Sequence, residues 1–162
     1  MPRRWVGLAI GLLNGYLVIR TDLPSFVVTL ATLFAVAGLT LGLSVILAGS
    51  TGVAQKSDPI TKMILGDFIG GKFEVILLWW IAAMIFVGYI LSHSKYGNWI
   101  LALGGDKVSA RNAGIPTDRL NLALYMASGL GAAVVGMCQA ILYNSAQVSA
   151  GQSFIFNSII AV

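Results

Sequence analysis

Long apolar blocks alternate with short polar segments along the chain. Four uncharged blocks, at residues 5–19, 26–47, 75–91 and 120–143, run for about 15 to 24 residues each. A helix of about 20 apolar residues crosses the ~30 Å hydrocarbon core of a bilayer. The pattern therefore predicts an all-α, polytopic bundle with four transmembrane spans, of which the first is marginal for crossing alone.

The sequence ends inside an apolar segment. Residues 154–162 would cover only about 13 Å of the bilayer core as a helix, at ~1.5 Å per residue. We expect them to start a fifth span, and residues 1–162 to form one transmembrane domain that is a fragment of a longer protein. A signal peptide would resemble the first block, but no small-residue cleavage site precedes Arg20, which favours a retained span or the remnant of a longer one.

Small residues recur every four positions in the first and last long blocks. Side chains four apart share one helix face, and small ones let a second helix approach closely in a membrane. Close helix packing is the expected role of both stripes, which consist of Gly7, Gly11 and Gly15 and of Ser128, Ala132 and Gly136.

A few polar side chains fall at or near membrane depth. Asn14 lies in the first block, Gln139 lies deep in the last, and Asn144 follows its end. Such groups are costly in lipid, so we expect them to face protein or water. They have two possible roles, interhelical hydrogen bonding or lining a solute path. Thr29 and Thr32 share a helix face and are expected to hydrogen-bond within the helix or to a neighbour.

The only long polar stretch between two strongly apolar blocks is residues 92–119, and it predicts a short helix. Asp106 suits an N-cap, residues 107–113 give about two turns, Gly114 suits the position after the C-cap, and Pro116 prevents continuation. Two turns are unstable alone in water, so either the flanking spans or another protein must hold them. We interpret the stretch as a docking loop.

The other polar stretch, residues 48–74, predicts an aqueous loop. Its apolar part, residues 60–65, could form a short interfacial helix. Asp67, Gly70 and Gly71 match neither a calcium-binding loop nor a phosphate-binding loop, so they favour no ion site.

Composition supports the membrane interpretation. Hydrophobic residues make up 57% of the 162 residues and charged residues 10%, and mean hydropathy is +0.87. The net charge of +4 is scattered, which excludes a nucleic-acid partner. Cys138 is the single cysteine, so no internal disulfide forms, and His93 has no second His or Cys nearby to share a metal. With no nucleophile–base pair or metal cluster, we expect a protein that is not an enzyme, with no metal site and no cofactor.

Positive charge does not settle which side of the membrane residues 92–119 face. With four spans, they share a side with the turn at Arg20, and each side then carries five cationic residues. If Arg3 and Arg4 are set aside, the count becomes five against three and favours a cytoplasmic position for residues 92–119. The two sets are Arg20, Lys95, Lys107, Arg111 and Arg119, and Arg3, Arg4, Lys56, Lys62 and Lys72.

Several motifs in order along the chain resemble one family. The run from Gly104 through residues 110–115, followed by Asp118-Arg119 and residues 120–136, is similar to the membrane permease subunits of bacterial ABC importers for simple sugars, of the ribose and xylose type. The early segments Leu13-Asn14-Gly15 and Leu23-Pro24-Ser25-Phe26 with residues 29–32, and the later Ser145-Ala146 with Gly151, also resemble that family.

This resemblance implies a multi-pass protein of the bacterial inner membrane that forms the solute pathway. It implies that residues 92–119 are a cytoplasmic coupling loop whose helix docks on an ABC ATP-binding subunit. It also implies a periplasmic sugar-binding protein and a second permease chain, in a homodimer or with a similar chain, as partners beside the lipid bilayer. The docking residues implied are Gly104, Gly105, Asp106, Ala110, Arg111, Ala113, Gly114 and Ile115.

Two other functions remain open from the residues alone. An ion-coupled secondary transporter usually places charged residues within its spans, and these four spans have none. A structural helix-packing protein would need only the small-residue stripes. Arg111, taken locally, is also explained as a topology signal or a lipid contact.

Overall fold

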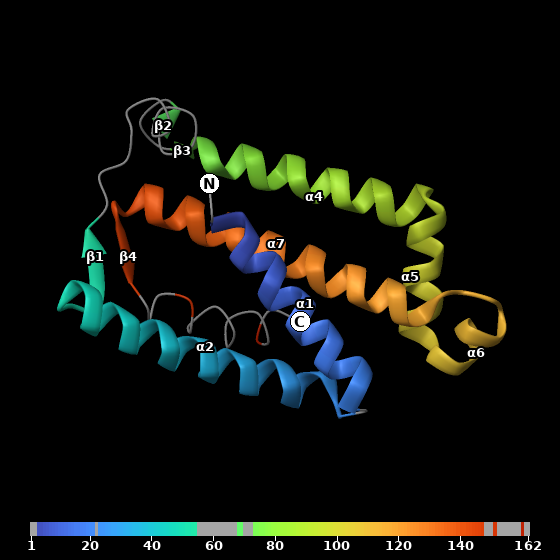
Figure 1. Ribbon diagram of the computed structural model, residues 1–162. Coiled ribbons are helices and arrows are strands. Elements are labelled where there is room, and N and C mark those ends of the chain that lie inside the picture. Colours follow the sequence, from blue (N-terminus) through green and yellow to red (C-terminus); the bar gives the residue numbers. More distant parts are fainter. Residues whose placement is uncertain are drawn as a thin grey trace.

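The computed structural model describes residues 3–21, 23–54, 68–69, 73–147, 151 and 160. Within them the chain forms six α-helices and two small two-stranded sheets (Figure 1). The predicted start of a fifth span at residues 154–162, the possible helix at residues 60–65, and the segment with Asp67, Gly70 and Gly71 lie outside the described residues, apart from Ile160.

Four helices account for the apolar blocks. They are α1 (Arg3–Thr21), α2 (Ser25–Ala48), α4 (Val75–His93) and α7 (Thr117–Leu142). Three of them, α2, α4 and α7, are long and apolar enough to cross a membrane, and α1 supplies a shorter apolar helix. The predicted all-α membrane bundle is confirmed.

Local sequence explains where these helices begin and end. Pro24 precedes the first residue of α2 with its φ at −53°, close to the helical value, and Gly49 ends α2 in a left-handed conformation at φ 65°. Helix α7 begins at Thr117, three residues before the predicted apolar block, because Pro116 ends the preceding segment and Asp118 suits the first turn.

Helices α1 and α7 pack so closely that their backbones touch. A Cβ added to Gly7 would lie 2.5 Å from the carbonyl oxygen of Gly129, and one added to Gly11 would collide with that of Tyr125. Gly15 instead faces the side chains of Leu122 and Tyr125. The face that α7 presents therefore runs through Tyr125, Gly129 and neighbouring residues.

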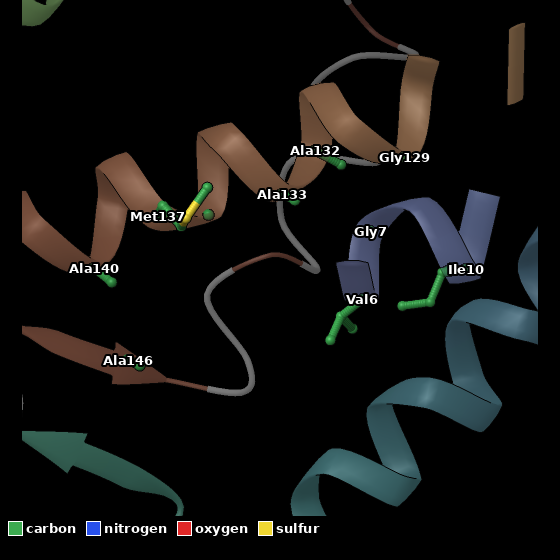
Figure 2. A pocket seen from close by; sticks show the side chains of 10 residues that line it. Val6, Gly7, Ile10, Gly129, Ala132, Ala133, Met137, Ala140 and Ala146 are labelled. Atoms are coloured by element: carbon green, nitrogen blue, oxygen red, sulfur yellow. The ribbon is translucent and has the colours of Figure 1, made fainter. Parts of the chain in front are cut away.

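The expected stripe on α7 lies beside this contact. Ser128, Ala132 and Gly136 are all exposed, and a Cβ on Gly136 would meet nothing within 4 Å. Ala132 and Gly136 instead line an apolar cavity of about 560 Å³ next to α1, with Gly7 and Val6 on its other wall. Figure 2 shows Ala132 and Ala133 of α7 facing the start of α1 across that space.

The other two long helices flank this pair. In the view of Figure 1, α4 and α2 lie on opposite sides of α1 and α7. Both carry large exposed apolar side chains, such as Phe34 at 66% and Met84 at 74%. In a bilayer, acyl chains or other helices cover such surfaces.

Two short sheets, which the sequence did not predict, lie at one end. Strand β1 (Gly52–Ala54) pairs antiparallel with β4 (Ser145–Gln147), so that Val53 is opposite Ala146. Strands β2 (Phe68–Ile69) and β3 (Phe73–Glu74) pair with each other. The β1–β4 ladder joins the segments that follow α2 and α7, while the connection from α4 to α7 lies at the opposite end (Figure 1).

Candidate functional site

The polar stretch at residues 92–119 folds into two helices, of which the sequence predicted only the second. Helix α5 (Lys95–Gly105) begins after Ser94, whose hydroxyl accepts a hydrogen bond from the amide of Gly97 at 3.0 Å. The missed signal is a serine cap followed by apolar residues at helical spacing, namely Tyr96, Trp99, Ile100 and Leu103.

Asp106 ends α5 and begins α6 (Lys107–Asn112). Its backbone amide donates to the carbonyl of Ala102, while its carboxylate accepts from the amides of Val108 and Ser109, both at 3.1 Å. The Ser109 hydroxyl also donates to this carboxylate. These bonds, first the one from the Ser109 hydroxyl, hold the pKa of Asp106 below its ordinary value of 3.8. The cap is therefore complete at neutral pH and is lost only as the pH falls through that lowered pKa.

The C-terminal end of α6 is capped by backbone hydrogen bonds that require a residue in the left-handed conformation. Gly114 has φ 81°, and its amide donates to the carbonyl of Arg111 at 3.0 Å. The amide of Ile115 reaches back to the carbonyl of Ala110 at 3.1 Å. This is the Schellman arrangement, and it confirms the predicted position of Gly114 after the C-cap.

The start of α7 holds α6 in place. Ala110 and Thr117 are 3% and 2% exposed, which makes this corner one of the best-buried places among the described residues. Lys107 and Arg111 lie 3.9 and 3.8 Å from the carboxylate of Asp118, although such exposed ion pairs each contribute only about 0–1 kcal/mol. Packing against a flanking span therefore supplies part of the support that a two-turn helix requires.

One face of α6 remains open to an external partner. Val108 is 66% exposed, and the Arg111 side chain is 71% exposed. Residues three apart share a helix face, so an apolar side chain and a cation lie side by side at the tip of the α5–α6 connection. Gly104, Gly105 and Ala113 are also exposed, and a Cβ on either glycine would meet nothing within 4 Å.

The three proposed pathway residues are not brought together. Asn14 lines a cavity of about 320 Å³ between α1 and α2. Gln139 is half-buried on α7 and lines neither this cavity nor the one beside α1. Asn144 is exposed in the turn between α7 and β4, with φ 49°, a conformation that asparagine tolerates better than most residues.

The described residues contain no cluster that could serve as a metal centre. In that part of the chain, no three His, Cys, Asp or Glu side chains are placed to hold a metal ion. Cys138 is buried within α7.

Comparison with known proteins gives a family. A model described as "Branched-chain amino acid transport system / permease component" matches residues 5–162. The chain belongs to this permease family. It is a multi-pass membrane protein, in agreement with its apolar helices.

Individual permeases of known systems align over most of the chain. The ribose import permease protein RbsC of Escherichia coli K12 is 29% identical over 159 residues, which cover 97% of this chain and 48% of RbsC. The probable ABC transporter permease protein y4mJ of Sinorhizobium fredii is 33% identical over 157 residues, covering 97% and 46%. The L-arabinose transport system permease protein AraH of Escherichia coli K12 is 28% identical over 151 residues, covering 88% and 44%.

The chain thus spans about half the length of the permeases that it matches. No solved structure matches it. The resemblance to sugar permeases that the motifs indicated is confirmed by these relatives.

Proposed function

We propose that this chain is part of the membrane-spanning subunit of an ATP-driven importer for simple sugars in the bacterial inner membrane. The observation that carries the proposal is α6, a short helix capped at both ends, anchored on α7 and open on one face. The names of RbsC and AraH as ribose and arabinose permeases support the choice of sugars.

In this proposal, α6 is the coupling helix and docks in a groove on an ABC ATP-binding subunit in the cytosol. Docking covers exposed Val108 and pairs Arg111 with an acidic group of the partner. Because α6 is anchored on α7, closure of the ATPase moves α7. Helix α5 connects α6 to α4, so α4 moves as well. Such rigid-body movement shifts the solute pathway between outward and inward access.

The residues of this docking unit have distinct parts in the proposal. Asp106 and Gly114 set the two ends of α6, Ala110 and Ile115 anchor it, and Arg111 contacts the partner. Gly104, Gly105 and Ala113 leave room for the ATPase to approach.

The remaining partners follow from the importer type. A periplasmic binding protein delivers the sugar, and a second permease chain, most simply an identical one, completes the pathway. The stripe Gly7, Gly11 and Gly15 serves packing against α7, and Asn14 lies on the solute path. Gln139 and Asn144 are further, weaker candidates for that path.

Uptake by the full-length protein with its ATPase and binding protein tests this function. We expect pentose uptake into cells to stop on ATP depletion and to persist when an ionophore collapses the ion gradients, because the ATPase supplies the driving force. An ion-coupled transporter would give the reverse result. Transport of leucine in place of pentoses would refute the sugar assignment and favour the substrate in the description of the family model.

A single cysteine tests the cytoplasmic position of α6. We expect Asn112→Cys, in a Cys138→Ala background, to resist a membrane-impermeant maleimide in intact cells and to react in inside-out vesicles. Asn112 is exposed and makes no side-chain bond to the Asp106 cap, so the substitution leaves α6 intact. Labelling from outside intact cells would place the helix on the wrong side for an ATPase.

A further inference from the structure

The cavity between α1 and α2 has polar groups on both of its walls. Its volume is about 320 Å³, within the usual range for small-molecule sites. Asn14 is the polar side chain from α1, and Thr29, Thr32 and Thr40 are those from α2. The other described residues that line it are apolar or glycine, namely Ile10, Leu33, Val36, Ala37 and Gly151.

The threonines of this cavity offer acceptors rather than donors. Each hydroxyl donates its proton to the backbone carbonyl four residues earlier on α2, at 2.7 to 2.9 Å. A hydroxyl has one proton and two lone pairs, so each oxygen can still accept a hydrogen bond. The within-helix hydrogen bonds predicted for Thr29 and Thr32 are therefore present. Because these bonds use the hydroxyl protons, the three threonines have no proton left to donate to a ligand.

Asn14 adds an acceptor that lacks a partner. Its Oδ1 is buried and makes no hydrogen bond to any described residue. Buried carbonyl oxygens are almost always paired, because an unpaired one loses its hydration without compensation. The same side chain also carries a donor, because its amide nitrogen has two hydrogens.

A ligand for this cavity must therefore bring several donors and no net charge. The described lining residues include no Asp, Glu, Lys or Arg, so an ammonium or carboxylate group would meet no counter-charge from them. Sugar hydroxyls match the requirement, since each is a donor and an acceptor. Thr29 and Thr40 are eleven residues apart, or roughly 16 Å along α2, so the acceptors form a track rather than a point.

We propose that this track between α1 and α2 is a binding station for a neutral polyhydroxylated solute, with Asn14 Oδ1 accepting from a solute hydroxyl. The inference rests on the proposed import function and specifies where and by what groups the solute is held. It also predicts that the site favours a sugar over a zwitterionic amino acid, because the described lining offers no counter-charge.

Substitutions that remove single polar groups test the station in the full-length permease reconstituted with its ATPase and binding protein. We expect Asn14→Leu and Thr32→Val each to slow uptake of D-ribose, D-xylose or L-arabinose about 5- to 10-fold, the effect of losing roughly one hydrogen bond. The matched control is Thr21→Val, which removes a hydroxyl that donates to Leu17 in the same way but lies outside the cavity. ATPase activity and thermal stability of each variant show that the protein is assembled.

The outcomes separate this inference from the proposed function. If the unsubstituted complex transports pentoses but Asn14→Leu and Thr32→Val transport as fast as Thr21→Val, the station is refuted and the importer stands. If the unsubstituted complex transports no pentose, both proposals fail. Slower uptake in the two cavity variants, with ATPase activity retained, supports the station.

Solute protection gives a second measurement. Thr40→Cys, in a Cys138→Ala background, places a thiol on an exposed position of the track. We expect pentoses to slow its reaction with a small methanethiosulfonate during ATP turnover, and leucine at the same concentration to leave the rate unchanged. Protection by leucine alone, or by neither solute, contradicts the proposal.

Discussion

Alanine at Gly11 or Gly129 is expected to destabilise the folded protein by about 2–3 kcal/mol, at the upper end for overpacking. At both positions an added Cβ collides with a backbone carbonyl oxygen of the opposite helix, that of Tyr125 or that of Gly7. A backbone carbonyl cannot move aside as a flexible side chain does, so α1 and α7 must separate. In a membrane, helices associate through such close packing, because lipid supplies no hydrophobic drive.

Thermal unfolding of the detergent-purified protein measures this effect, and protease resistance in native membranes gives an independent readout. Two other glycines of α7 provide matched controls. A Cβ on Gly131 or Gly136 would meet nothing within 4 Å, so Gly131→Ala and Gly136→Ala should leave stability within about 0.5 kcal/mol. Equal losses at all four positions would show that helix flexibility, and not the α1–α7 contact, is responsible.

Valine at Gly114 is expected to abolish ATP-driven uptake by the full-length complex, with at least a tenfold loss. Gly114 has φ 81°, where a β-branched side chain is strongly disfavoured, by at least the roughly 1–2 kcal/mol typical of the left-handed region. The strain opens the two backbone bonds that close α6. A helix of six residues depends on both of its caps, so we expect the docking face to be lost even though the Asp106 cap remains.

Co-purification of the ATPase with the variant permease measures docking directly. Gly49→Val is the matched control, since Gly49 also has a left-handed φ of 65° and open space around it, but ends α2 in another part of the molecule. We expect Gly49→Val to retain the ATPase and Gly114→Val to lose it. If both variants bound the ATPase normally, α6 would not be the docking helix.

Charge reversal at Arg111 separates the surface of α6 from its shape. Arg111→Glu leaves the caps of α6 intact but places an acid beside Asp118. We expect weaker ATPase binding, and we expect Arg111→Lys to restore it. If Arg111 acts only as a topology signal, binding is unchanged in both variants.

The predictions that succeeded concern features set by neighbouring residues. The spans follow from runs of apolar residues. The ends of α6 follow from Asp106, through its side chain, and from Gly114, through its backbone, and both form hydrogen bonds only with residues close by in the sequence. Local chemistry of this kind is visible in the sequence. Helix α5 was equally local, but its Ser94 cap lay inside a stretch interpreted only as a polar loop.

Features that depend on contacts between residues far apart in the sequence could not be predicted from local patterns. The three-residue strands β1 and β4 are about 90 positions apart and have no alternating pattern long enough to detect. The small-residue stripe expected on α7 begins at Ser128, but only the position of the partner helix decides that the next residue, Gly129, meets α1. The cavity at Asn14 likewise requires knowing that α2 lies against that face of α1.

The β1–β4 ladder has a consequence for the proposed coupling, in which a partner displaces α6. It ties the segment after α2 to the segment after α7, at the end of the molecule opposite to α6 (Figure 1). When the α6 end of α7 is displaced, the far end is held by the strand pairing and α7 pivots about it. Under the proposed docking, α7 should therefore tilt together with α1, so that the largest displacement falls near α6 and the smallest near the ladder.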